Sequence, residues 1–396
     1  MSDQNPVFIP GPTNMPDAIR KACDMATLDH RSPAFADIFG PAVAGVKQIL
    51  RSKTAEVVIF PASGTGGWEA AICNTLSPGD TVLAARHGMF SQRWIDLCQR
   101  HGLNVHKIET PWGEGCPVAA YAEALAADKS HEIKAVLVTH NETATGVRSD
   151  VAAVRAAMDA ANHPALLLVD GVSSIASMEF RMDDWGVDIA VTGSQKGFML
   201  PAGLAIVGVS PKALARAETA TLPRTFFDFR DMLNSYATGG YPYTPAVGLL
   251  NGLKLSTQML LEEGLGNVIA RHHRIANGVR RAVAAWGMSP YAASPKLYSD
   301  TVTAIRVPEG FDATDIVTRA ADTYGVAFGV GLGEVAGKVF RIGHLGLMTD
   351  VMALAGIATA EMAMADLGYP VTLGSGVAAA QDYYRHGNGK AAMAAE

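Results

Sequence analysis

The chain has 396 residues, of which 49% are hydrophobic and 18% are charged, a composition that allows one large and one smaller domain with a sizeable core. The formal net charge of −6 provides no basic footprint for nucleic acids or anionic membranes. No apolar stretch is long enough to span a bilayer.

The N-terminus and the cysteines favour a cytoplasmic location. The opening residues, MSDQNPVFIPGPTN, lack the basic segment and apolar run of a secretory signal. The cysteines have no CxxC pair and no regular spacing, which favours idle thiols over a redox or metal site. They are Cys23, Cys73, Cys98 and Cys116.

Between residues 55 and 210, short β-branched runs alternate with helical patterns. The predicted strands are Glu56–Phe60, Thr81–Ala84, Val105–Glu109, Ala135–Thr139, Leu166–Asp170, Ile189–Thr192 and Leu204–Val209. The predicted helices between them are Gly67–Leu76, Ser91–His101, Val118–Ala127 and Asp150–Asn162. This alternation predicts an α/β fold with a mostly parallel sheet that is buried on both faces.

The rest of the chain suggests three parts: an N-terminal extended segment (1–20), a large domain (21–265) and a small C-terminal α+β domain (266–396). Residues 221–246 are aromatic and rich in Gly and Pro, which indicates an irregular functional loop. A long helix over 247–286 is expected to join the domains, and strands are predicted at 301–307 and 339–342. The tail, 378–396, is expected to be poorly ordered.

The first motif with a chemical meaning is PASGTGGWEA (61–70), a Gly-rich turn between a strand and a helix. Backbone N–H groups at such a helix start bind phosphate, although similar turns also bind dinucleotides or only pack tightly. The glycines do not have the GxGxxG spacing of a dinucleotide fold.

Asp170 and Lys196 each follow a predicted strand. Asp170 ends the apolar strand of LLLVDGVSS, and a magnesium ion, a ribose or a salt bridge could each satisfy its carboxylate. Lys196 lies in GSQKG, where it is either an ordinary solvated lysine or a desolvated amine suited to forming an imine. Ligands bind where parallel strands end, which favours a functional site.

Arg341 lies within the apolar strand VFRIGHLG (339–346). A buried guanidinium requires an anion, and its planar fork suits a carboxylate. Together, a phosphate cradle, a strand-end Asp, a Gly-flanked Lys and a lone Arg are the parts needed by a pyridoxal-phosphate enzyme that acts on amino acids.

With these motifs, from PGPTN (10–14) to RIGHLG (341–346), the chain resembles the class V, fold-type I aminotransferases, in particular their alanine/serine–glyoxylate branch. The resemblance implies that Lys196 is the Schiff-base lysine and that Gln195 contacts the phosphate. It implies that Asp170 partners the pyridine nitrogen and that Arg341 binds the substrate carboxylate.

The resemblance implies further cofactor contacts. Val172 and Phe90 match the residues that pack on the two faces of the ring, and Thr143, in HNETATG, matches the partner of its O3′. Thr65 and Gly66 match the phosphate loop, which is slightly shorter here than in some relatives.

Fold and assembly are implied in the same way. The family has a large domain with a seven-stranded, mainly parallel sheet, a small C-terminal domain and a homodimer with shared active sites. Tyr241 and Thr244, in GGYPYTP, match residues that reach the phosphate of the second subunit.

The implied reaction is transfer of an amino group from an L-amino acid to glyoxylate, which yields glycine. L-Aspartate, giving oxaloacetate, is the expected donor, with serine or alanine as alternatives. Arg31, Arg224 and His344 are candidates for binding a donor side-chain carboxylate, and a purely structural role is the competing interpretation for each.

More distant alternatives are a cysteine desulfurase, a nucleotide-binding dehydrogenase and a non-catalytic binding protein. Against the desulfurase, Gln195 precedes the lysine where His is usual, and no cysteine follows Cys116.

Overall fold

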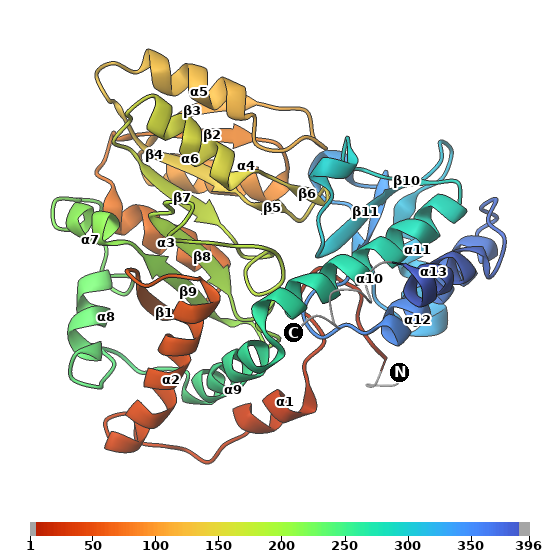
Figure 1. Cartoon of the computed structure of the whole chain (residues 1–396), viewed down its shortest axis with the longest axis horizontal. Helices are drawn as coiled ribbons and strands as arrows, with labels where there is room; N and C mark the ends of the chain where they lie inside the picture. The colour runs from red at the N-terminus through yellow and green to blue at the C-terminus, as the bar shows by residue number, and fades with distance from the viewer. Residues whose placement is uncertain (1–4, 388–396) are drawn as a thin grey trace.

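The computed structural model describes residues 5–387 and is built around a seven-stranded sheet of order β1-β9-β8-β7-β4-β2-β3 (Figure 1). The strands are β1 (Glu56–Ala62), β2 (Thr81–Arg86), β3 (Asn104–Glu109), β4 (Ile133–Thr139), β7 (Leu166–Asp170), β8 (Ile189–Gly193) and β9 (Gly203–Val209). Neighbours from β8 through β3 are parallel, whereas β9 is antiparallel to β1 and β8. The predicted fold class, including the mainly parallel sheet, is confirmed.

The central strands are apolar because the sheet is covered on both sides. β7 and β8 are buried along their whole length. The helices that lie between these strands in the chain, or directly after the last of them, are α3 (Gly64–Thr75), α4 (Met89–Arg100), α5 (Val118–Ala127), α6 (Val151–Ala160) and α7 (Pro211–Ala217). Helix α3 begins three residues before its predicted start at Gly67, so the Gly-rich turn is itself the first turn of the helix.

A second group of helices lies beside the β1 end of the sheet: α1 (Asp17–Cys23), α2 (Pro33–Ile49), α8 (Phe229–Tyr236) and α9 (Val247–Glu263). Helix α8 interrupts the loop predicted at 221–246. The single helix predicted at 247–286 is instead α9 followed by α10 (Leu265–Ala285). The break lies at Gly264, whose φ of +82° is a left-handed value that a helix interior does not contain.

The C-terminal part contains a four-stranded antiparallel sheet of β10 (Ser289–Pro290), β11 (Val302–Arg306), β13 (Val339–Gly343) and β12 (Gly329–Val330). Helices α11 (Ala313–Tyr324), α12 (Asp350–Asp366) and α13 (Ser375–His386) complete it. The expectation of disorder from residue 378 is wrong up to His386, because α13 packs on α10 and α12. Residues 388–396 lie outside the described part of the chain.

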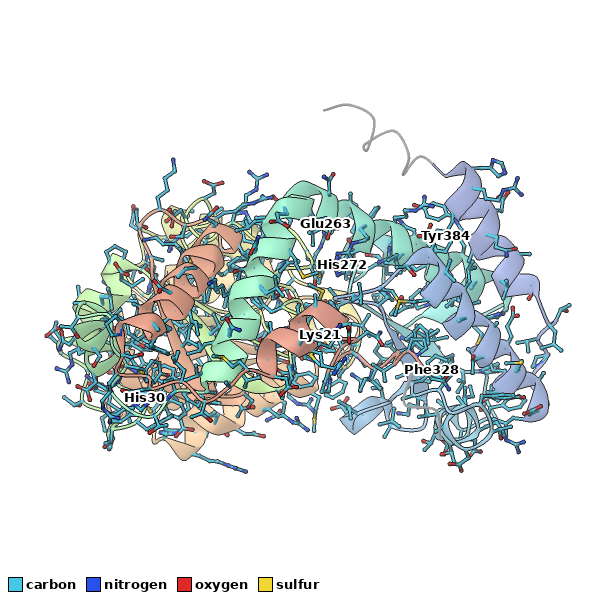
Figure 2. All side chains as sticks on the ribbon, turned by 90° about the horizontal axis from the view of Figure 1, so that it is seen from below. Lys21, His30, Glu263, His272, Phe328 and Tyr384 are labelled. Atoms are coloured by element: carbon cyan, nitrogen blue, oxygen red, sulfur yellow. The ribbon has the colours of Figure 1, made fainter. Side chains whose placement is uncertain are left out.

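Residues 5–387 form two hydrophobic cores. The first surrounds the large sheet and extends to Val268, and the second begins again at Ile275 and also includes Phe8 from the N-terminus. In Figure 2, Glu263 lies between the two halves, while Phe328 and Tyr384 lie in the second. Because α10 contributes to both cores, the boundary at residue 265 stays a prediction. No helix within residues 5–387 is long and apolar enough to cross a membrane.

Candidate functional site

Neighbouring parallel strands bring Asp170 and Lys196 together. Asp170 is the last residue of β7 and is paired in register with Val191 of β8. The turn after β8 contains Lys196, so both side chains lie at the carboxyl edge of the sheet. Each is buried, and each influences the pKa of the other.

Lys196 is held by the N-terminal segment. Its Nζ donates a hydrogen bond to the carbonyl of Pro10, and Thr13 Oγ1 donates to the Lys196 carbonyl at 3.1 Å. A Cβ on Gly11 would lie 2.6 Å from Nζ, so this approach requires glycine. Burial and the nearby Arg341 guanidinium lower the pKa of Lys196 to about 8, so that much of the amine is neutral in mildly alkaline solution.

Asp170 is a buried carboxyl group whose neighbours compensate only part of the cost of burial. Its Oδ1 accepts a hydrogen bond from the Val172 N–H at 3.0 Å. Burial, assisted by the nearby Glu142, raises the pKa of Asp170 to about 7. A cation placed against this group would lower that pKa again, so the site favours a positively charged partner.

Arg341 connects the two halves of the molecule at this point. Its Nε donates to the Val330 carbonyl at 2.9 Å, and its Nη1 donates to the Thr143 carbonyl at 3.0 Å. Within residues 5–387, Nη2 has no hydrogen-bond acceptor from the protein. Burial lowers the pKa of Arg341 to about 10, which still leaves the side chain cationic at neutral pH and able to bind an anion.

The predicted phosphate contacts converge on the start of α3. A Cβ on Gly193 would lie 2.8 Å from Gln195 Oε1 and 3.6 Å from the Gly64 nitrogen, which places the amide beside the helix N-terminus. Thr65 is exposed and Gly66 half-buried in the first turn, where N–H groups have no intrahelical partner. Gln195 Oε1 is buried without a hydrogen-bond partner in the described chain.

The residues predicted to contact the ring come from three different segments. Val172 lies two residues after Asp170 and packs closely on Gly64. A Cβ on Gly64 would lie 2.5 Å from Cγ2 of Val172. Thr143 is buried, with its hydroxyl 2.7 Å from that of Ser173. Phe90 is half-buried in the first turn of α4.

Tyr241 and Thr244 lie apart from this group. The Tyr241 hydroxyl donates to the Ile59 carbonyl at 2.5 Å and its ring packs edge-on against Phe35 and Phe39. Thr244 is exposed. Within one chain neither residue reaches Lys196, and their contact with a second subunit stays a prediction.

Two of the three candidates for a side-chain carboxylate are structural. His344 bonds to Thr303 and to the Asp300 carbonyl, and burial lowers its pKa to about 3, so it is neutral. Arg224 is committed to Asp228 and to main-chain carbonyls.

Arg31 is exposed. Its backbone N–H donates a hydrogen bond to Asp29 Oδ1 at 2.9 Å. A role for its side chain in binding a donor carboxylate stays a prediction.

The cysteines are all free thiols, and three of them are buried. Cys73 Sγ lies 3.7 Å from His101 Nδ1, while Glu69 approaches the other ring nitrogen at 3.5 Å. Burial raises the pKa of Cys73 to about 11, which keeps the thiol protonated at neutral pH.

Sequence reasoning missed Glu142, which is fully buried, accepts a hydrogen bond from the Phe90 N–H and raises the pKa values of Asp170 and Arg341. Its signal was present in HNETATG, where a charged residue follows a predicted strand among small side chains. The Pro10 carbonyl was also missed, because its contact with Lys196 joins residues 186 positions apart.

Residues 21–341 match the family model described as aminotransferase class-V. The chain is 70% identical to an L-aspartate–glyoxylate aminotransferase of Paracoccus denitrificans, over 97% of each chain. It is 54% identical to a serine–glyoxylate aminotransferase of Hyphomicrobium methylovorum, over 98% of this chain and 96% of that one. The crystal structure of pyridoxamine–pyruvate aminotransferase from Mesorhizobium loti superimposes with a TM-score of 0.90 at 32% identity, covering 97% of this chain and 98% of that one.

Proposed function

Because this chain belongs to the class V aminotransferase family, we propose that it transfers the amino group of L-aspartate to glyoxylate, with pyridoxal 5′-phosphate as cofactor. The products are oxaloacetate and glycine. One observation carries the choice of donor, namely the 70% identity to an L-aspartate–glyoxylate aminotransferase over nearly the whole chain.

The residues present fit this cofactor. The start of α3 offers N–H groups to a phosphate, and the unpartnered amide of Gln195 lies beside it. Because a phosphate accepts hydrogen bonds, the NH₂ end of this side chain would face it, and a rotation of the amide by 180° exchanges its two ends. The Asp170 carboxyl, whose pKa burial raises, calls for a cation such as a protonated pyridine nitrogen. Lys196 provides a buried amine with a lowered pKa.

When bound, the cofactor supplies an electron sink that stabilises negative charge at the substrate Cα. Lys196 would hold the cofactor covalently through Nζ and, once freed, take the proton from Cα. Asp170 would keep the pyridine nitrogen protonated. Arg341, with Nη2 free of protein acceptors in the described chain, would orient the α-carboxylate of donor and acceptor alike.

The donor is tested by a panel of amino acids with glyoxylate as acceptor. We expect much higher kcat/KM with L-aspartate than with L-serine or L-alanine, and equimolar oxaloacetate and glycine as products. A coupled assay for oxaloacetate and chromatographic detection of glycine measure both. Serine–glyoxylate aminotransferases are also close relatives, so a preference for serine with release of hydroxypyruvate would contradict the aspartate proposal.

Arg341→Lys should raise the KM for the donor and for glyoxylate together. Lysine keeps the charge but loses the planar fork, and disrupting a buried charge pair costs about 2–5 kcal/mol. Steady-state kinetics with each substrate varied in turn measures both constants. Arg306→Lys provides the control. Arg306 is an exposed arginine on β11, two residues after Ala304, which pairs with Arg341. A rise confined to one substrate would show that Arg341 does not bind both carboxylates.

We also propose a homodimer in which Tyr241 and Thr244 bind the phosphate of the second subunit. Support comes from the match of GGYPYTP to the family and from the exposed position of Thr244 in a single chain. Thr244→Asp places a negative charge against the phosphate, and Tyr241→Phe removes only a hydroxyl.

Mixing Lys196→Ala protein with a Tyr241→Phe/Thr244→Asp double variant should restore activity. In a heterodimer, one site receives an intact lysine from one subunit and intact phosphate contacts from the other. Activity is measured after subunit exchange, with heterodimers verified by differently tagged chains. If heterodimers form without restoring activity, the phosphate site is built within one chain.

A further inference from the structure

Glu142 is a buried charged residue that the mechanism above does not use. It is the second residue of the short hairpin β5 (Asn141–Glu142) and β6 (Val147–Arg148), directly after β4, and its exposed fraction is 0%. A buried carboxylate is costly unless hydrogen bonds and charges compensate it. The compensation found here comes from groups that surround the candidate cofactor site.

Three backbone N–H groups donate to the Glu142 carboxylate. Oε2 accepts from Phe90 at 3.0 Å and from Ser91 at 2.9 Å, and Oε1 accepts from Ala144 at 3.1 Å. The first two N–H groups belong to the first turn of α4, where a negative charge also complements the helix dipole. The third belongs to the hairpin itself, so the carboxylate joins the two segments.

Each joined segment supplies a residue predicted to contact the cofactor or substrate. Helix α4 contributes Phe90, the predicted stacking residue. The hairpin contributes Thr143, whose hydroxyl is the predicted partner of O3′ and whose carbonyl accepts the bond from Arg341 Nη1. One carboxylate therefore links the ring face, the ring edge and the substrate-binding arginine.

We propose that Glu142 is a positioning residue that fixes Phe90 and Thr143 relative to each other around the cofactor ring, and Arg341 through the Thr143 carbonyl. This inference rests on the proposed function. Gly88 leaves room for the carboxylate, because a Cβ at this position would lie 2.1 Å from Glu142 Cγ.

The charge of Glu142 also acts on the site. It raises the pKa of Arg341 against the effect of burial, and it raises that of Asp170. Burial raises the pKa of Glu142 itself, and the N–H groups of Ser91, Ala144 and Phe90 oppose that rise, so its negative charge depends on the bonds that join the two segments.

Glu361 provides a matched control. It is also buried, at 1% exposure, and its carboxylate accepts bonds from the backbone N–H groups of Gly374 and Gly376 at the start of α13 and from the Trp286 indole. It lies in the second core, among residues that supply no predicted site contact. Glu361→Gln therefore makes the same chemical change to the same kind of helix cap away from the site.

The experiment compares Glu142→Gln and Glu361→Gln in three measurements. These are the thermal unfolding midpoint of the protein, the visible circular dichroism of bound pyridoxal phosphate with its Kd, and the kinetics with donor and glyoxylate. In Glu142→Gln an amide NH₂ must face at least one N–H donor, so both variants should lose stability.

Only Glu142→Gln should change the visible dichroism of the bound cofactor. It should also raise the cofactor Kd about tenfold or more and lower kcat/KM for both substrates about tenfold or more. Equal stability loss in the two variants with unchanged dichroism, Kd and kinetics for Glu142→Gln would overturn the proposal.

If Glu142→Gln does not fold, Gly88→Ala displaces the carboxylate without removing its charge and is judged by the same criteria. The φ of Gly88 is 174°, an extended value that any residue adopts, so the substitution acts only through the added Cβ. A wild-type protein that binds no pyridoxal phosphate would refute the proposed function itself, whereas normal wild-type binding with unaltered variants refutes only the assignment to Glu142.

Discussion

Lys196→Ala should reduce transamination by several orders of magnitude, because one amine both holds the cofactor and moves the Cα proton. The Nζ of Lys196 is buried and donates a hydrogen bond to the Pro10 carbonyl, a contact that alanine cannot make. Purified variant reconstituted with excess cofactor should retain it only loosely. Turnover under saturating donor and glyoxylate, together with cofactor retained after desalting, measures both effects.

The matched control is Lys129→Ala, which removes an exposed lysine after α5. It should leave turnover and cofactor content unchanged. Turnover of Lys196→Ala close to that of the control would contradict the assignment of the catalytic lysine.

Asp170→Asn should lower kcat by about a hundredfold or more while cofactor occupancy falls far less. Asparagine keeps the shape but cannot supply the negative charge that holds the pyridine nitrogen protonated, and removing one such electrostatic contact costs about that much in other enzymes. Single-turnover rates normalised to bound cofactor measure the effect per site.

Asp188→Asn provides the control. Asp188 is a buried carboxylate directly before β8, at the amino ends of the parallel strands, whereas Asp170 lies at their carboxyl ends. Asp188 accepts hydrogen bonds from the Leu167 N–H and the Ser210 hydroxyl. Its replacement should cost stability without changing the rate per site. If Asp170→Asn instead loses cofactor but keeps its rate per site, Asp170 is an anchor and not an electronic partner.

Much of the large sheet could be predicted because its information is local. A buried parallel strand is a short apolar run, and the run at Leu166–Asp170 has the same bounds in sequence and structure. The parallel register then brings the residues after β7 and β8 together, which places Asp170 beside Lys196. These two positions could be argued from the sequence alone.

Other features depend on contacts between distant segments. The contact of Lys196 with Pro10, and that of Arg341 with the Thr143 carbonyl, each join residues more than 180 positions apart. HNETATG shows Glu142 as a charged residue after a predicted strand, but its contacts could not be predicted, because its partners are backbone N–H groups that residue types do not reveal. His344 was a reasonable cation by position, but burial removes its charge.

The central claim is that Lys196 holds pyridoxal phosphate. Purified wild-type protein is treated with sodium borohydride, which makes a lysine-linked cofactor permanent, then digested and mapped by mass spectrometry. We predict that the mass of the reduced cofactor is found on Lys196 and that borohydride treatment abolishes activity. Cofactor found on another lysine, or no modified peptide from active protein, would contradict the claim.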